Sequence, residues 1–78
     1  MGVDSRVVVD CSGQNCPMPL VETRKAILNG NKGQIVKVIG THAQSFEEIP
    51  MALEAMGMRI ITREEGEDGV WAIEFQIQ

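Results

Sequence analysis

The chain has 78 residues, of which 44% are hydrophobic and 23% are charged, and its formal net charge is −4. This length allows one domain over residues 1–78 and excludes two, and the ordinary globular composition argues against disorder. The acidic balance argues against a protein that neutralises many phosphates, so direct nucleic-acid binding is not expected.

The first half of the chain predicts a strand, a helix and a second strand. A β-branched run at 6–10 ends in a polar loop, and helix-forming residues then follow from Pro17 to about Asn29. Glycines at 30 and 33 stop this helix, and another β-branched run at 34–39 predicts the second strand.

A second helix is predicted to begin at Ser45, because Ser45-x-x-Glu48 has the form of a capping box. Apolar residues repeat after it at helical spacing, and the helix is expected to end near Gly57. Pro50 lacks an N–H group, so this helix either runs through it or begins with a distinct turn and restarts there.

Two further strands, at 58–63 and 71–77, are joined by a predicted hairpin turn at 64–69, whose acidic residues are expected to face solvent. The order βαβαββ predicts an α+β fold. It is a two-layer α/β sandwich in which a four-stranded mixed sheet carries both helices on one face, since strand–helix–strand crossovers are right-handed. The apolar residues expected to meet between the layers are Trp71, Ile73, Phe75 and Ile77 with Leu20, Ile27, Leu53 and Met56.

Cys16-Pro17-Met18-Pro19 stands where the first loop becomes the first helix. Pro17 suits the first helical position, which makes Cys16 the predicted N-cap. There the free N–H groups and the positive end of the helix dipole favour a thiolate, so Cys16 is the candidate nucleophile. Pro17, Met18 and Pro19 are the supporting residues of this helix start, where the two prolines are expected to stiffen the turn and hold the sulfur in one direction.

Cys11 and His42 are candidate auxiliary residues. Cys11 closes the first strand and is either an inert core residue or a resolving thiol. His42 follows the second strand, at the edge where Cys16 is also expected, and is either simply exposed or an activating partner of the thiol. A metal site built from these three residues has too few ligands and no zinc-like spacing, so no metal is expected.

The residues Asp10-x-x-Gly13-x-x-Cys16-Pro17-x-Pro19, followed by Arg24-Lys25-Ala26, resemble the opening signature of the TusA/SirA-like proteins. The likeness extends over nearly the whole chain, and that family shares the βαβαββ order. Thr41-His42-Ala43 stands where many members carry an acidic segment.

The resemblance implies a sulfur carrier, a sulfurtransferase component in which Cys16 accepts a sulfane sulfur as a persulfide. The implied partners are a sulfur-donor protein, either a cysteine desulfurase or rhodanese-like, and a protein acceptor in tRNA thiolation, molybdenum-cofactor synthesis or sulfur metabolism. Arg24 fits the family's Arg-Lys pair but lies about 12 Å along the helix from Cys16, which makes it an auxiliary candidate at most.

Two other interpretations stay open: a non-catalytic adaptor that binds protein or RNA, and a redox switch between Cys11 and Cys16. No cofactor is indicated. No stretch is long and apolar enough for a membrane span, and no secretory signal is visible, so the expected location is the cytoplasm.

Overall fold

The computed structural model describes residues 7–14 and 18–78. It contains every element that the sequence predicts, in the predicted order. The elements are β1 (Val7–Cys11), α1 (Met18–Asn29), β2 (Ile35–Gly40), α2 (Ala43–Ala55), β3 (Arg59–Glu65) and β4 (Trp71–Gln76).

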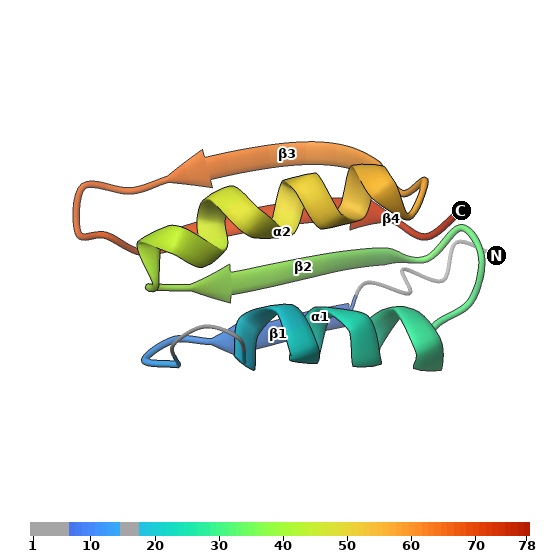
Figure 1. The fold of residues 1–78 in the computed structure, drawn as a ribbon, viewed down its shortest axis with the longest axis horizontal. Helices are drawn as coiled ribbons and strands as arrows, with labels where there is room; N and C mark the ends of the chain where they lie inside the picture. The colour runs from blue at the N-terminus through green and yellow to red at the C-terminus, as the bar shows by residue number, and fades with distance from the viewer. Residues whose placement is uncertain (1–6, 15–17) are drawn as a thin grey trace, which may run out of the picture.

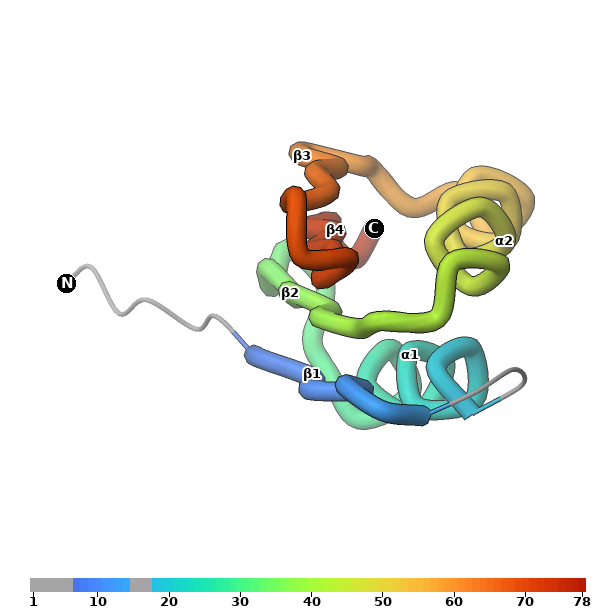
Figure 2. The backbone as a smooth tube through the Cα atoms, turned by 90° about the vertical axis from the view of Figure 1, so that its left-hand side faces the viewer, coloured from blue at the N-terminus to red at the C-terminus, as the bar shows by residue number. Residues whose placement is uncertain are grey.

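The four strands form one mixed sheet in the order β1-β2-β4-β3. β1 and β2 run parallel because α1 crosses between them, and β2 with β4 and β4 with β3 run antiparallel. Both helices cover the same face of the sheet (Figures 1 and 2). The predicted two-layer fold is therefore confirmed.

The core lies between the sheet and the helices. Alternate residues of β4 point into it, as the sequence predicts, because successive side chains of a strand face opposite sides. Leu20 and Ile27 pack against this core and Leu53 is fully buried, but Met56 is 37% exposed. The prediction that Met56 belongs to the core is wrong, since it follows the last helical residue as the C-cap, where the chain turns away. The core cluster is formed by Cys11, Val36, Val38, Phe46, Ile49, Leu53, Trp71, Ile73, Phe75 and Ile77.

α2 ends close to the predicted residue. Gly57 has a φ of +80°, a left-handed conformation that glycine adopts without a Cβ clash. The Gly57 N–H donates to the Glu54 carbonyl and the Met58 N–H to the Leu53 carbonyl. This pair of bonds is the Schellman arrangement, which satisfies carbonyls that the helix end leaves free.

The predicted start of α2 is wrong by two residues. The helix begins at Ala43, and His42, in extended conformation, is its N-cap. The predicted capping box would need Ser45 as the N-cap, but the Ser45 N–H instead donates to His42 Nδ1. The Glu48 carboxylate accepts a bond from the Gln44 side chain at 3.0 Å. Pro50 lies inside the helix, so of the two alternatives the continuous helix is correct.

The β3–β4 hairpin forms as predicted, although β3 is longer than expected. Glu64 and Glu65 continue the strand, opposite Ala72 and Trp71. The turn is closed by a bond from the Gly66 N–H to the Val70 carbonyl at 2.8 Å. The acidic side chains at 64–68 are exposed, as predicted. None of the helices in the described residues is long and apolar enough to cross a bilayer.

Candidate functional site

The edge of the sheet where β1 and β2 end is the frame of the predicted site. The parallel register places Cys11 opposite Gly40, so the loops that follow the two strands emerge together. The Gly13 N–H donates to Thr41 Oγ1 at 2.9 Å and ties the two loops to each other. Cys16 and Pro17 lie outside the described residues, between Gln14 and the first residue of α1.

The first residue of α1 is exposed, and the second is buried in the protein. Met18 is 42% exposed, whereas Pro19 is fully buried and its carbonyl accepts a 2.8 Å bond from Thr23 Oγ1. The first turn of α1 carries no acidic residue, so no carboxylate there offsets the positive end of the helix dipole. Met18 and Pro19 thus occupy the helix start that the sequence predicts.

Cys11 lies in the core rather than on the surface. Its side chain is fully buried among apolar residues at the end of β1. Burial raises the pKa of the Cys11 thiol, and the nearby carboxylates of Glu22 and Asp10 raise it further. A buried, protonated thiol is a poor nucleophile, so the geometry favours the inert-core interpretation of Cys11.

Asp10, the last residue before Cys11, stays outside this core. The Ser12 N–H donates to its carboxylate at 3.0 Å, and this bond, with a second from the Ser12 hydroxyl, lowers the pKa of Asp10. Asp10 is therefore a turn-forming carboxylate that organises the loop after β1.

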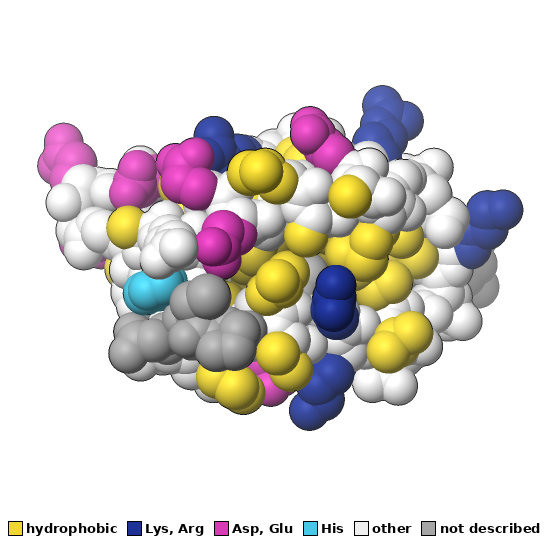
Figure 3. All heavy atoms as spheres, viewed as in Figure 1, with side chains coloured by type: hydrophobic (Ala, Val, Ile, Leu, Met, Phe, Trp, Pro, Cys, Tyr) yellow, Lys and Arg dark blue, Asp and Glu magenta, His cyan; other side chains and the backbone are white. Residues whose placement is uncertain are grey.

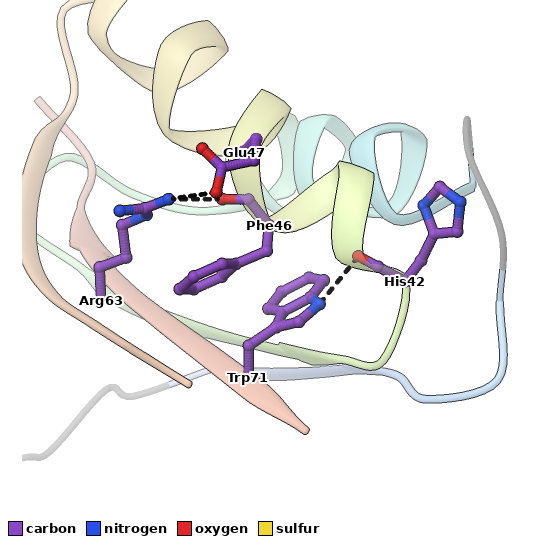
Figure 4. Close-up of polar contacts among 5 residues, drawn as sticks. All are labelled: His42, Phe46, Glu47, Arg63 and Trp71. Carbon is purple, nitrogen blue, oxygen red and sulfur yellow. Dashed lines mark hydrogen bonds and ion pairs between the residues drawn. The ribbon is translucent and has the colours of Figure 1, made fainter. Parts of the chain in front are cut away.

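His42 is held as part of the α2 start. Its Nδ1 accepts from the Ser45 N–H at 3.3 Å and lies 3.0 Å from the Ser45 hydroxyl. Its carbonyl accepts from the Trp71 indole N–H at 2.9 Å, and its ring points away from that indole (Figure 4). His42 is therefore a structural cap with a half-buried ring at the edge where the β1 and β2 loops meet.

A cluster that sequence reasoning missed braces α2 against β3 (Figure 4). Pro50 has no N–H, so the Phe46 carbonyl one turn earlier has no helical donor. Arg63 supplies one at 3.5 Å, forms an ion pair with Glu47 at 3.2 Å, and lies 4.2 Å above the Phe46 ring. The only signal in the sequence was Pro50 itself. A proline inside a helix predicts a carbonyl without a helical donor, but it does not predict which distant side chain will donate to that carbonyl.

Arg24 lies on α1, away from the end that carries the motif. It lines a shallow groove with Ile27, Leu28 and Met56, and within the described part of the chain it forms no ion pair. The neighbouring Lys25 differs, since it contacts Glu22 at 3.9 Å. Among residues 7–14 and 18–78, no three His, Cys, Asp or Glu side chains gather where they could hold a metal ion.

The comparisons with known proteins cover almost the whole of this fold. The family model described as sulfurtransferase TusA matches residues 7–77. The chain belongs to the TusA family. The family assignment agrees with the resemblance carried by the Cys16-Pro17-x-Pro19 motif.

Individual relatives agree with the family. The chain is 30% identical to the sulfur carrier protein TusA of Allochromatium vinosum, over 74% of this chain and 78% of that protein. It is 32% identical to a proposed sulfur carrier of Archaeoglobus fulgidus, over 80% of each chain. The crystal structure of a SirA-like protein from Desulfitobacterium hafniense superposes with a TM-score of 0.79 at 27% identity, covering 90% of this chain and 95% of that one.

Proposed function

We propose that this protein is a sulfur carrier whose Cys16 thiolate takes a sulfane sulfur from a donor protein and relays it to an acceptor protein. The observation that carries the proposal is the family match over residues 7–77, within which Cys16 stands two residues before α1. Cys11, the other cysteine, is buried with a raised pKa, which leaves Cys16 as the candidate nucleophile.

The proposed reaction exchanges one sulfur–sulfur bond for another. The Cys16 thiolate attacks the terminal sulfur of the donor's persulfide, and the donor's own cysteine leaves as a thiolate. The proton of the terminal sulfur stays with it, so Cys16 ends as a persulfide and no external oxidant is needed. Attack by an acceptor thiolate on that terminal sulfur then returns Cys16 to a thiolate.

The described part of the protein suits a carrier better than an enzyme with its own substrate pocket. The space between sheet and helices is filled by buried apolar side chains, and grooves in the described residues, such as the one lined by Arg24, Ile27, Leu28 and Met56, are open to the surface. Partner surfaces would therefore supply the rest of the reaction site. A reducing compartment such as the cytoplasm, which would keep Cys16 reduced, is part of this proposal.

The test is sulfur loading by a cysteine desulfurase supplied with cysteine, read by intact mass and peptide mapping. We expect the wild type to gain one sulfur atom at Cys16 and the Cys16→Ser variant to gain none. Cys11→Ala is the matched control, because it removes the other thiol without adding a polar group to the core, and it should load normally. Sulfur on Cys16→Ser, or on Cys11 in the wild type, would contradict the proposal.

The redox-switch alternative has less support. A disulfide between Cys11 and Cys16 would require the Cys11 thiolate to form inside the core, where its pKa is raised. The adaptor alternative needs Cys16 only as a helix cap, so it predicts that the protein takes up no sulfur at Cys16. Loading by a rhodanese-like donor but not by the desulfurase would leave the carrier function intact and change only the partner.

A further inference from the structure

The loop between β1 and α1, in which the sequence places Cys16, is held at its start by two hydrogen bonds of different reach. The Gln14 N–H donates to the Cys11 carbonyl at 3.0 Å, which closes a local turn. The Gly13 N–H donates to Thr41 Oγ1 at 2.9 Å, across 28 positions of the sequence. The bond to Thr41 therefore attaches this loop to a different part of the fold.

Thr41 stands between two residues whose positions the core fixes. Gly40, the last residue of β2, is paired with Trp71 in the sheet. His42, the N-cap of α2, accepts at its carbonyl from the Trp71 indole N–H at 2.9 Å (Figure 4). Because its neighbours on both sides are held in this way, the Thr41 hydroxyl oxygen offers the Gly13 N–H an acceptor at a fixed place.

The chemistry expected of Cys16 depends on where its sulfur lies. The end of a helix favours a thiolate only over its first turn, and a displacement of about 1 Å at a reacting atom can slow a reaction about a hundredfold. Gly13 precedes Cys16 by three residues, and three Cα–Cα steps span at most about 11 Å. A bond that fixes Gly13 therefore limits the positions that the sulfur can reach.

We propose that Thr41 is a positioning residue for Cys16: its hydroxyl oxygen holds the β1–α1 loop so that the sulfur stays at the start of α1. This inference rests on the proposed function and adds to it a residue that acts through the loop rather than on the transferred sulfur. It also gives a role to the first residue of Thr41-His42-Ala43, the segment at which the sequence departs from the family pattern.

The corner between β2 and α2 also lies at the surface, so partner docking is the competing explanation for any effect of Thr41. Thr41 is exposed, and the imidazole of His42, the single histidine of the chain, reaches the surface of the face that carries both helices (Figure 3). Loss of a docking contact would weaken binding of the partner, whereas a misplaced sulfur would lower the rate within the complex. The experiment therefore measures the two quantities separately.

The experiment compares Thr41→Val with Thr41→Ser. Valine has a similar shape to threonine but no acceptor, and serine keeps the hydroxyl. Thr62→Val is the matched control, because Thr62 is an exposed threonine of β3, the edge strand opposite β1. Each protein is loaded from the cysteine desulfurase with cysteine over a range of carrier concentrations, and the persulfide at Cys16 is measured by mass spectrometry. Alkylation of Cys16 by iodoacetamide at neutral pH is measured separately, because it needs no sulfur donor.

We expect Thr41→Val to lower the maximal loading rate about tenfold and to leave the half-saturating carrier concentration within about twofold of the wild type. Alkylation should slow about threefold, because a sulfur that leaves the helix start is less often a thiolate. Thr41→Ser and Thr62→Val should match the wild type in both measurements. The urea midpoints of all four proteins should agree closely, since water can replace Thr41 at this exposed N–H.

Four results would overturn the positioning role of Thr41. A raised half-saturating concentration at an unchanged maximal rate would assign Thr41 to partner docking. Equal slowing by Thr41→Ser and Thr41→Val would show that the hydroxyl is not responsible. Loading and alkylation of Thr41→Val at wild-type rates would show that the bond does not affect the sulfur, and a large fall in its urea midpoint would make the role structural.

Failure of the carrier function itself would give a different result. A wild type that is alkylated at Cys16 but takes sulfur neither from the desulfurase nor from a rhodanese-like donor would overturn the carrier function. The alkylation rates of the three variants would still test whether Thr41 positions the Cys16 thiol.

Discussion

The two helices lie on the same face of the sheet (Figure 2). Their polar and charged groups nevertheless have different surroundings. At the start of α2, the His42 carbonyl, the Phe46 carbonyl and the Glu47 carboxylate all have partners on β3 or β4. On the outer side of α1, Arg24 has no described ion-pair partner and Leu28 is largely exposed.

This difference separates groups that stabilise the fold from groups that contribute little to its stability. A polar group whose bonds are completed inside the molecule contributes to the stability of the fold, because an unmet buried donor or acceptor is costly. A charge without a described counter-ion, beside exposed apolar side chains, gains little from the fold and is available to a partner. We therefore expect substitutions at the start of α2 to lower stability more than substitutions on the outer side of α1.

The largest expected effect is at Trp71. Trp71→Ala would leave a cavity against Phe46 and Gly40 and remove the indole donor to the His42 carbonyl, which would keep only its bond from the Phe46 N–H. It should lower the free energy of unfolding by about 3–5 kcal/mol. Gly40 has no side chain where the indole lies, which allows this close packing. The loss is measured by urea unfolding followed by circular dichroism. Tryptophan fluorescence cannot be used, because the variant lacks the single tryptophan of the chain. A loss below about 1 kcal/mol would contradict the packing argument.

A medium effect is expected at Arg63. Arg63→Ala removes the donor to the Phe46 carbonyl, the ion pair with Glu47 and the contact with the Phe46 ring. The ion pair is exposed and the hydrogen bond long, so we expect a loss of about 1–2 kcal/mol in the same measurement. Arg59→Ala, on the same strand, is the matched control and should stay within about 0.5 kcal/mol of the wild type. Equal losses would remove the special role of Arg63.

The smallest expected effect concerns Cys11. Its pKa is higher in the folded than in the unfolded chain, so its contribution to stability is complete below the unfolded pKa and disappears as pH rises through the folded pKa. The wild type should therefore lose stability in the alkaline range, and Cys11→Ala should reduce that slope.

Alkylation gives an independent measurement of the same residue. An alkylating reagent at neutral pH should modify Cys11 only when the protein is unfolded in urea. Alkylation of Cys11 in the native protein at the rate of a free thiol would show that the core does not protect it.

Much of the fold could be predicted from the sequence, because its signals are local. β4 alternates apolar and polar residues at the period of a strand, and every second residue from Trp71 to Ile77 is buried accordingly. Gly57 predicted the end of α2, because the residue after a helix often adopts a left-handed backbone conformation that favours glycine. For the site, the local pattern predicted Cys16 at a helix start, but it could not predict the environment of Cys11, which depends on what packs over β1.

The sequence by itself determined the order of the elements, the face that each strand buries and the family motif around Cys16, because each depends on neighbours in the chain. Only the tertiary structure decided where α2 begins. Ser45 had the better capping pattern, but His42 takes the cap while the Trp71 indole, from a distant strand, binds its carbonyl. It likewise decided that Arg63 would supply the hydrogen-bond donor that the Phe46 carbonyl lacks because of Pro50. Such choices depend on side chains far apart in the chain, which only folding brings together.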